Sequence, residues 1–140
     1  MKTKLFALLL MSLATLIPAG CAKSGSSAEH KIIKSAKAAE MTVTLSSPTG
    51  ELKKGENELT VTFADAAGQS VDVGAASLNF HMGAMGTMAE MNDKATLTTT
   101  ETPGKYRALI NLTMKGTWEV QIKFQGARGT GQTSMSVQAK

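Results

Sequence analysis

The feature that most constrains this chain is a series of short segments in which apolar and polar residues alternate. In residues 57–63, Leu59, Val61 and Phe63 alternate with polar residues, and the same period of two runs through 106–113 and 117–124. Because the side chains of a strand point alternately to its two faces, this period predicts strands with one buried face. The segments that we expect to form strands are 41–45, 57–63, 76–80, 95–100, 106–113, 117–124 and 133–137.

Turn-forming residues separate these segments, as in Pro48-Thr49-Gly50, Ala67-Gly68-Gln69 and Pro103-Gly104. Seven short strands with turns roughly 8–12 residues apart are typical of immunoglobulin-like folds. The 140 residues, of which 42% are hydrophobic, are enough for one small domain. We therefore expect an all-β fold, an immunoglobulin-like antiparallel β-sandwich of about seven strands, over residues 41–140.

Residues 1–20 have the three parts of an export signal. Lys2 and Lys4 precede an apolar run at 5–17, and the small residues Ala19-Gly20 follow it. The run is shorter than the roughly 20 apolar residues that a membrane span needs, so we expect cleavage. Residues 17–21, Ile-Pro-Ala-Gly-Cys, resemble the lipobox of bacterial lipoproteins, which implies lipidation of Cys21. The alternative is an ordinary secreted protein whose cysteine is unmodified.

Residues 21–40 are rich in Ser, Ala, Lys and Gly, and we expect them to form a flexible tether after the lipidated cysteine. Lys31, Lys34 and Lys37 recur there every three residues. They suit either contact with anionic lipid headgroups or a solvated spacer, and the spacer is favoured. The expected location is the periplasmic side, lipid-anchored to a membrane. Ala22-Lys23 differs from the usual inner-membrane retention signal, which slightly favours the outer membrane.

Charge and residue types argue against several classes of function. The formal net charge is +4, and the basic residues are scattered rather than concentrated, so we expect no nucleic-acid binding. Cys21 is the only cysteine, which excludes an intrachain disulfide and a cage of thiolates. The chain has no Ser/His/acid set, and we interpret Asp72, Glu90 and Asp93 as surface charges. We therefore expect that the protein is not an enzyme.

One short window holds four methionines at three-residue spacing. They are Met82, Met85, Met88 and Met91, and they follow His81 directly. A spacing of three fits neither the alternation of a strand nor a helical stripe longer than one turn. Gly83 and Gly86 favour a loop, in which we expect the four thioethers to converge. After residue 20 the only other methionines are Met41, Met114 and Met135.

The methionine window suggests a copper site. A thioether is a soft, neutral ligand that stays unprotonated at physiological pH, and soft sulfur ligands select Cu(I). The imidazole of His81 adds a stronger donor and would help the site tolerate Cu(II). Zinc, calcium and magnesium fit poorly, because the chain has only two histidines and no acidic cluster. The predicted metal ligands are His81, Met82, Met85, Met88 and Met91.

The alternative interpretation of the window needs no metal. Methionine also fills irregular apolar gaps and makes adaptable binding surfaces. The loop would then cap the core of the sandwich or contact a partner protein.

Two further motifs resemble a known family. Pro103-Gly104-x-Tyr106, followed by Met114-x-Gly116-x-Trp118-x-Val120 and preceded by the methionine window, resembles the YtkA-like domain, which is related to FixH-like proteins. The resemblance implies an immunoglobulin-like sandwich, with copper handling or cytochrome oxidase assembly in some relatives. It also implies that Tyr106 and Trp118 are core residues, that Gly104 and Gly116 lie in turns, and that the four methionines are ligands.

These observations predict a lipid-anchored, extracytoplasmic Cu(I) carrier or buffer that uses its Met-rich loop. Its expected partners are a membrane and a copper-handling or oxidase-assembly protein. The alternative function is a membrane-tethered interaction or assembly module that binds no metal.

Overall fold

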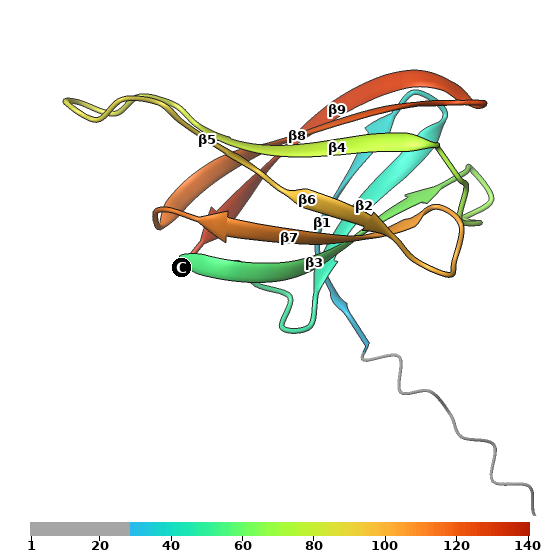
Figure 1. Cartoon of the computed structure of the whole chain (residues 1–140), viewed down its shortest axis with the longest axis horizontal. Helices are drawn as coiled ribbons and strands as arrows, with labels where there is room; N and C mark the ends of the chain where they lie inside the picture. The colour runs from blue at the N-terminus through green and yellow to red at the C-terminus, as the bar shows by residue number, and fades with distance from the viewer. Residues whose placement is uncertain (1–28) are drawn as a thin grey trace, which may run out of the picture.

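A computed structural model describes residues 29–140, and within them nine strands form two antiparallel sheets packed face to face (Figure 1). The five-stranded sheet has the order β1 (Lys31–Ala38), β2 (Met41–Ser47), β3 (Gly55–Ala64), β7 (Lys105–Leu112) and β6 (Thr96–Thr99). The four-stranded sheet has the order β5 (Met91–Lys94), β4 (Ala75–Met82), β8 (Gly116–Gly126) and β9 (Gly129–Ala139). The predicted all-β antiparallel sandwich is confirmed.

The core lies between the two sheets, where the apolar side of each alternating segment points inward. In β7, Tyr106, Ala108, Ile110 and Leu112 are buried, whereas the residues between them are exposed. Trp118 of β8 is completely buried. This confirms the core positions expected for Tyr106 and Trp118.

Phe63 makes one aromatic contact within its own sheet, to Tyr106 of β7, and one across the core to the other sheet, to Phe124 of β8. The ring of Phe63 in β3 meets Tyr106 edge-on, with centroids 5.6 Å apart, and Phe124 of β8 at 5.4 Å. Edge-to-face pairs of this kind add about 0.5–1.5 kcal/mol each beyond the area they bury.

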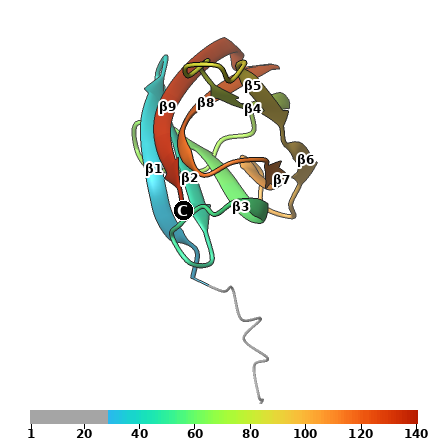
Figure 2. The same cartoon turned by 90° about the vertical axis from the view of Figure 1, so that its left-hand side faces the viewer.

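The chain passes from one sheet to the other along the side formed by β5 and β6. Only Ala95 separates these strands, and its backbone N–H donates to the carbonyl oxygen of Leu78 at 3.0 Å. β5 pairs with β4 in one sheet, and β6 pairs with β7 in the other. On the opposite side of the sandwich β1 lies beside β9 (Figure 2), where the hydroxyl of Thr133 donates to the carbonyl of Lys37 at 2.8 Å.

The structure corrects the predicted tether at 21–40. Residues 31–38 form strand β1, which pairs with β2, and Ala38 is buried. An edge strand is bound to its neighbour by backbone hydrogen bonds, which do not depend on side-chain type. A lysine-rich segment can therefore form an edge strand if a few small apolar residues face the core. The domain therefore begins before residue 41. The strands additional to the seven predicted are β1 and β5.

The predicted signal at 1–20 and Cys21 lie outside the described residues. Residues 29–140 contain no helix long and apolar enough to cross a membrane.

Candidate metal-binding hairpin

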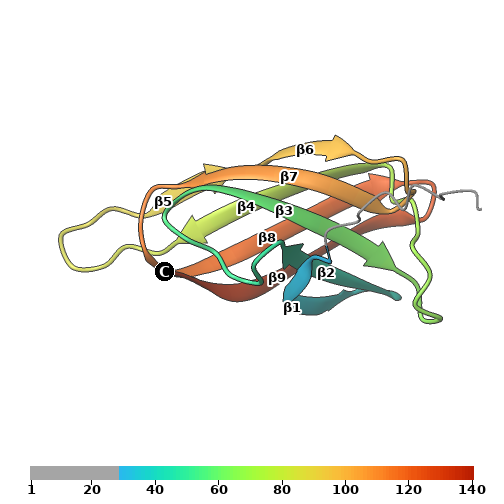
Figure 3. The ribbon, with the colours of Figure 1, turned by 90° about the horizontal axis from the view of Figure 1, so that it is seen from below.

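The methionine window forms the end of a β-hairpin that projects beyond the sandwich (Figures 1 and 3). Met82 of β4 stands opposite Met91 of β5, and Met85 forms a bridge with Met88. The backbone N–H of Met85 donates to the carbonyl oxygen of Met88 at 3.1 Å, and the backbone N–H of Met88 donates to the carbonyl oxygen of Met85 at 2.9 Å. Residues 83–90 therefore form a loop between β4 and β5, as expected, and one isolated bridge near its tip gives it the form of a hairpin.

A two-residue turn explains the isolated bridge at the tip. Gly86 and Thr87 connect Met85 to Met88, and Gly86 has a φ of 59°. Glycine at a positive φ in the first turn position is typical of the type II′ turn, whose twist matches that of the flanking strands. The turn fixes the register in which both pairs of methionines face each other.

The three-residue spacing divides the methionines into two pairs. Three steps along a strand span about 10 Å, and an odd number of steps leads to the opposite face of a regular ladder. The base pair, Met82 and Met91, therefore lies apart from the tip pair, Met85 and Met88. The four methionines that we expected to converge thus lie in two facing pairs on one hairpin.

The two pairs also differ in exposure. Met82 is only 3% exposed and belongs to the core, and Met91 is half-buried against it. Met85 and Met88 are 55% and 40% exposed. The tip pair is therefore accessible to an ion or a partner, whereas the base pair is joined to the end of the core.

His81 lies on the outer face of its sheet, opposite Asn92 on one side and Glu119 on the other. It precedes the inward-facing Met82, so its imidazole points away from the base pair. Its Nδ1 lies 3.1 Å from Oδ1 of Asn92, which also accepts from Nδ2 of Asn79 at 3.2 Å. An oxygen can only accept, so we assign the ring proton to Nδ1, which leaves Nε2 with a free lone pair.

The base of the hairpin is fixed to the turn between β7 and β8. The carboxylate of Asp93 accepts from the backbone N–H and the hydroxyl of Thr113, each at 3.1 Å. The same hydroxyl lies 3.5 Å from the sulfur of Met91. In the turn itself, the indole N–H of Trp118 donates to the carbonyl of Met114 at 3.1 Å. Asp93 thus holds the hairpin in place and is more than a surface charge.

Asp72 has a comparable structural role at a different site. It accepts from the backbone N–H of Gly74 at 2.8 Å and from the hydroxyl of Tyr106 at 3.2 Å. Burial raises the pKa of Tyr106 above its ordinary value of 10.0, and the hydrogen bond and charge of Asp72 raise it further. Glu90, in contrast, is an exposed residue of the hairpin, as predicted.

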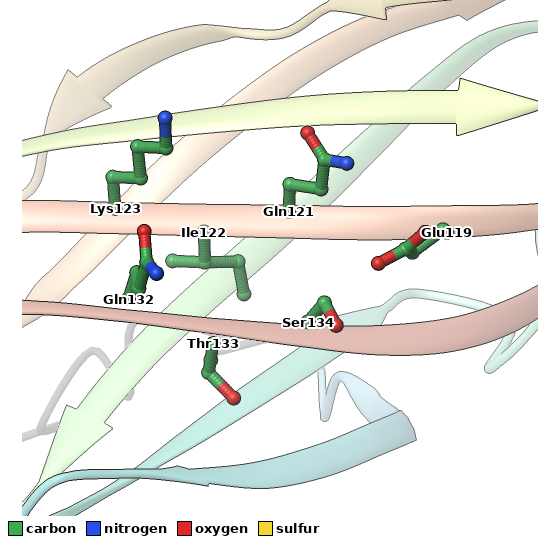
Figure 4. A pocket seen from close by; sticks show the side chains of 7 residues that line it. All are labelled: Glu119, Gln121, Ile122, Lys123, Gln132, Thr133 and Ser134. Carbon is green, nitrogen blue, oxygen red and sulfur yellow. The ribbon is translucent and has the colours of Figure 1, made fainter.

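A shallow depression of about 420 Å³ lies on the outer face of β8 and β9 (Figure 4). Its lining residues are Glu119, Gln121, Ile122, Lys123, Gln132, Thr133 and Ser134. None of them belongs to the methionine hairpin. In the described residues 29–140, His, Cys, Asp and Glu side chains nowhere gather in groups of three or more that would hold a metal. The thioethers are therefore the donors to consider.

The methionine window is visible in the sequence, whereas Thr113 and Met114 are not predicted from it as neighbours of the window's base. The motif Met114-x-Gly116-x-Trp118 was the available signal, but nothing in the spacing shows that this turn meets the hairpin.

A family model described as YtkA-like matches residues 35–123, which is more than half of the chain. No curated protein and no solved structure matches.

Proposed function

The chain belongs to the YtkA-like family, and from this premise we propose that it is an extracytoplasmic, lipid-anchored protein that binds Cu(I) through its methionine hairpin and passes the ion on. One observation carries the proposal: all four methionines of the window lie in facing pairs on a single projecting hairpin. A chance excess of methionine would not require such pairing.

The tip pair is suited to exchange of the ion. Two facing thioethers that are 55% and 40% exposed offer Cu(I) two soft, neutral ligands, and they leave the rest of its coordination sphere open to a partner's ligand. Weak, open coordination favours transfer over storage. His81, whose Nε2 is free, is the nearest nitrogen donor in sequence to the hairpin and lies at its base.

The location is part of the same proposal and rests on the sequence at 1–21. A lipid on Cys21 would hold the domain next to a membrane, within reach of a copper-handling or oxidase-assembly protein. The Cys21→Ser variant tests this anchor, because loss of the lipidated residue should move the protein from the membrane fraction to the soluble fraction.

The test of copper binding uses residues 21–140 with Cys21→Ser, because a free thiol would itself bind Cu(I). Titration against a chromogenic Cu(I) chelator measures the affinity. Replacing Met82, Met85, Met88 and Met91 by leucine should abolish binding. Because Leu and Met have similar volumes, each replacement should cost less than about 1.5 kcal/mol of stability. Binding by the folded leucine variant that equals the parent's would refute the proposal.

The matched control is Met135→Leu. Met135 is 5% exposed in β9 and lies outside the hairpin, so this variant carries the same chemical change in the same core. It should bind Cu(I) as the parent does.

A second candidate function rests on the exposure of the tip pair. Met85 and Met88 place flexible apolar side chains at the end of a projection, which also suits an adaptable protein contact. An assembly module of this kind would retain its partner equally with Cu(I) and with a Cu(I) chelator. Replacement of the tip pair by serine would release the partner, whereas replacement by leucine would not.

A further inference from the structure

The turn between β7 and β8 lies against the base of the methionine hairpin. Both are found at the same end of the sandwich in two perpendicular views (Figures 1 and 3). The hydroxyl of Thr113 lies 3.5 Å from the sulfur of Met91. A Cβ atom built on Gly116 would lie 3.2 Å from the terminal methyl of Met82. The two members of the base pair therefore contact the turn at two positions, on either side of Met114.

Met114 brings a third thioether to this place. Its side chain is half-buried and packs against the core, as Met91 does, and Met82 is part of that core. The hydrogen bond from Trp118, which is completely buried, fixes the backbone of Met114. Met114 thus lies between the two residues that approach the base pair, Thr113 and Gly116, with its side chain packed against the core.

The charge near this cluster suits a cation. Asp93 lies two residues after Met91, on the same side of β5, and its carboxylate is held by Thr113 at 3.1 Å. A carboxylate fixed beside neutral thioethers would offset the positive charge of a bound ion without needing to coordinate it.

Building on the proposed function, we propose that Met82, Met91 and Met114 form a three-thioether site for a soft monovalent cation, Cu(I), at the base of the hairpin. The tip pair then serves as the point of entry and exit. Three neutral sulfur donors complete a trigonal set, whereas Met82 and Met91 alone provide two. Met114, which the methionine window does not include, becomes a ligand.

The first test compares leucine variants of residues 21–140 with Cys21→Ser. Met114→Leu should lower the Cu(I) affinity at least tenfold in competition with the chelator, and X-ray absorption should show the number of sulfur neighbours of copper falling from three to two. Met41→Leu is the matched control. Met41 is 8% exposed in β2 of the opposite sheet, and its replacement should change neither value.

The second test needs no variant. Hydrogen peroxide oxidises accessible methionine to its sulfoxide, and mass spectrometry gives the rate at each position. Ag(I), a soft monovalent ion without the redox chemistry of Cu(I), should slow the oxidation of Met91 and Met114 at least fivefold. The rate at Met135 should not change.

The outcomes separate this inference from the proposed function. The three-thioether site is refuted if Met114→Leu binds Cu(I) as tightly as the parent and Ag(I) does not protect Met114 from oxidation. If replacing the four window methionines by leucine still abolishes binding in that case, copper binding by the hairpin stands. If leucine in the window also leaves binding unchanged, both proposals fail. Loss of affinity in Met114→Leu together with protection by Ag(I) supports the site.

Discussion

Gly104 is a residue at which the fold leaves no room for a side chain. Its φ is 78°, and a Cβ atom there would lie 2.4 Å from the carbonyl oxygen of Val71, a backbone atom. Gly68 has nearly the same φ, 80°, but nothing lies within 4 Å of its Cβ position. The two glycines therefore differ in packing and share the same backbone conformation.

We predict that Gly68→Ala lowers the free energy of unfolding by about 1 kcal/mol, the cost of a left-handed conformation. Gly104→Ala should lower it by about 3 kcal/mol or more, because the backbone of Val71 must also move. Urea unfolding followed by the fluorescence of Trp118 measures both. Equal losses in the two variants would mean that the close approach at Gly104 has no energetic consequence.

Ionisation of Tyr106 makes the free energy of unfolding depend on pH in the alkaline range. Its raised pKa means that the folded protein keeps the phenolic proton at a pH where the unfolded chain, near 10.0, loses it. Unfolding then releases a proton, so this contribution to stability is complete below pH 10 and is lost as the pH rises through the folded pKa.

We predict that the free energy of unfolding falls more steeply between pH 9.5 and 11.5 in the parent than in Tyr106→Phe, since Tyr106 is the only tyrosine. At neutral pH the variant should be less stable by about 1 kcal/mol, the usual value of a lost hydrogen bond. Urea midpoints over this range give both results. Parallel pH profiles would contradict the prediction.

At the scale of elements, the sequence predicts strands well where one face is buried and both edges are paired. β3, β7 and β8 have neighbours on both sides, and their inward positions are apolar except for Asn57 at the start of β3, so the alternation is nearly complete. β1 and β5 are edge strands whose inward residues are few or small. These strands are held by backbone hydrogen bonds, which do not require an alternating pattern of side chains, so the sequence does not predict them.

The candidate site shows the same limit. The methionine spacing identified the segment, because composition is visible in the sequence. The division into a base pair and a tip pair was not predictable, because it depends on a register that the Gly86-Thr87 turn sets. Met114 was missed because the contact of its turn with the hairpin is made only in the folded sandwich.

At the scale of the whole molecule, the two sheets are joined along both sides. β5 and β6 are one nearly continuous stretch of chain on one side, and β1 meets β9 on the other. β1 pairs with β2 beside Val43 and Leu45, which are completely buried. The N-terminal strand is therefore part of what encloses the core.

We predict that residues 29–140 unfold with the same free energy as residues 21–140, because every described strand is retained. Residues 41–140, which lack β1, should be less stable by about 3 kcal/mol or more. They lose the packing of the buried Ala38 and of the half-buried Ile33, which supplies part of the about 1.5–3 kcal/mol that full burial of an isoleucine is worth. They also leave the backbone groups of β2 that pair with β1 without those partners, while the pairing of β2 with β3 is kept. Urea unfolding of the three chains, monitored by Trp118 fluorescence, measures the difference. Equal stability of the two shorter chains would show that β1 only decorates the edge and that the folded domain begins at Met41.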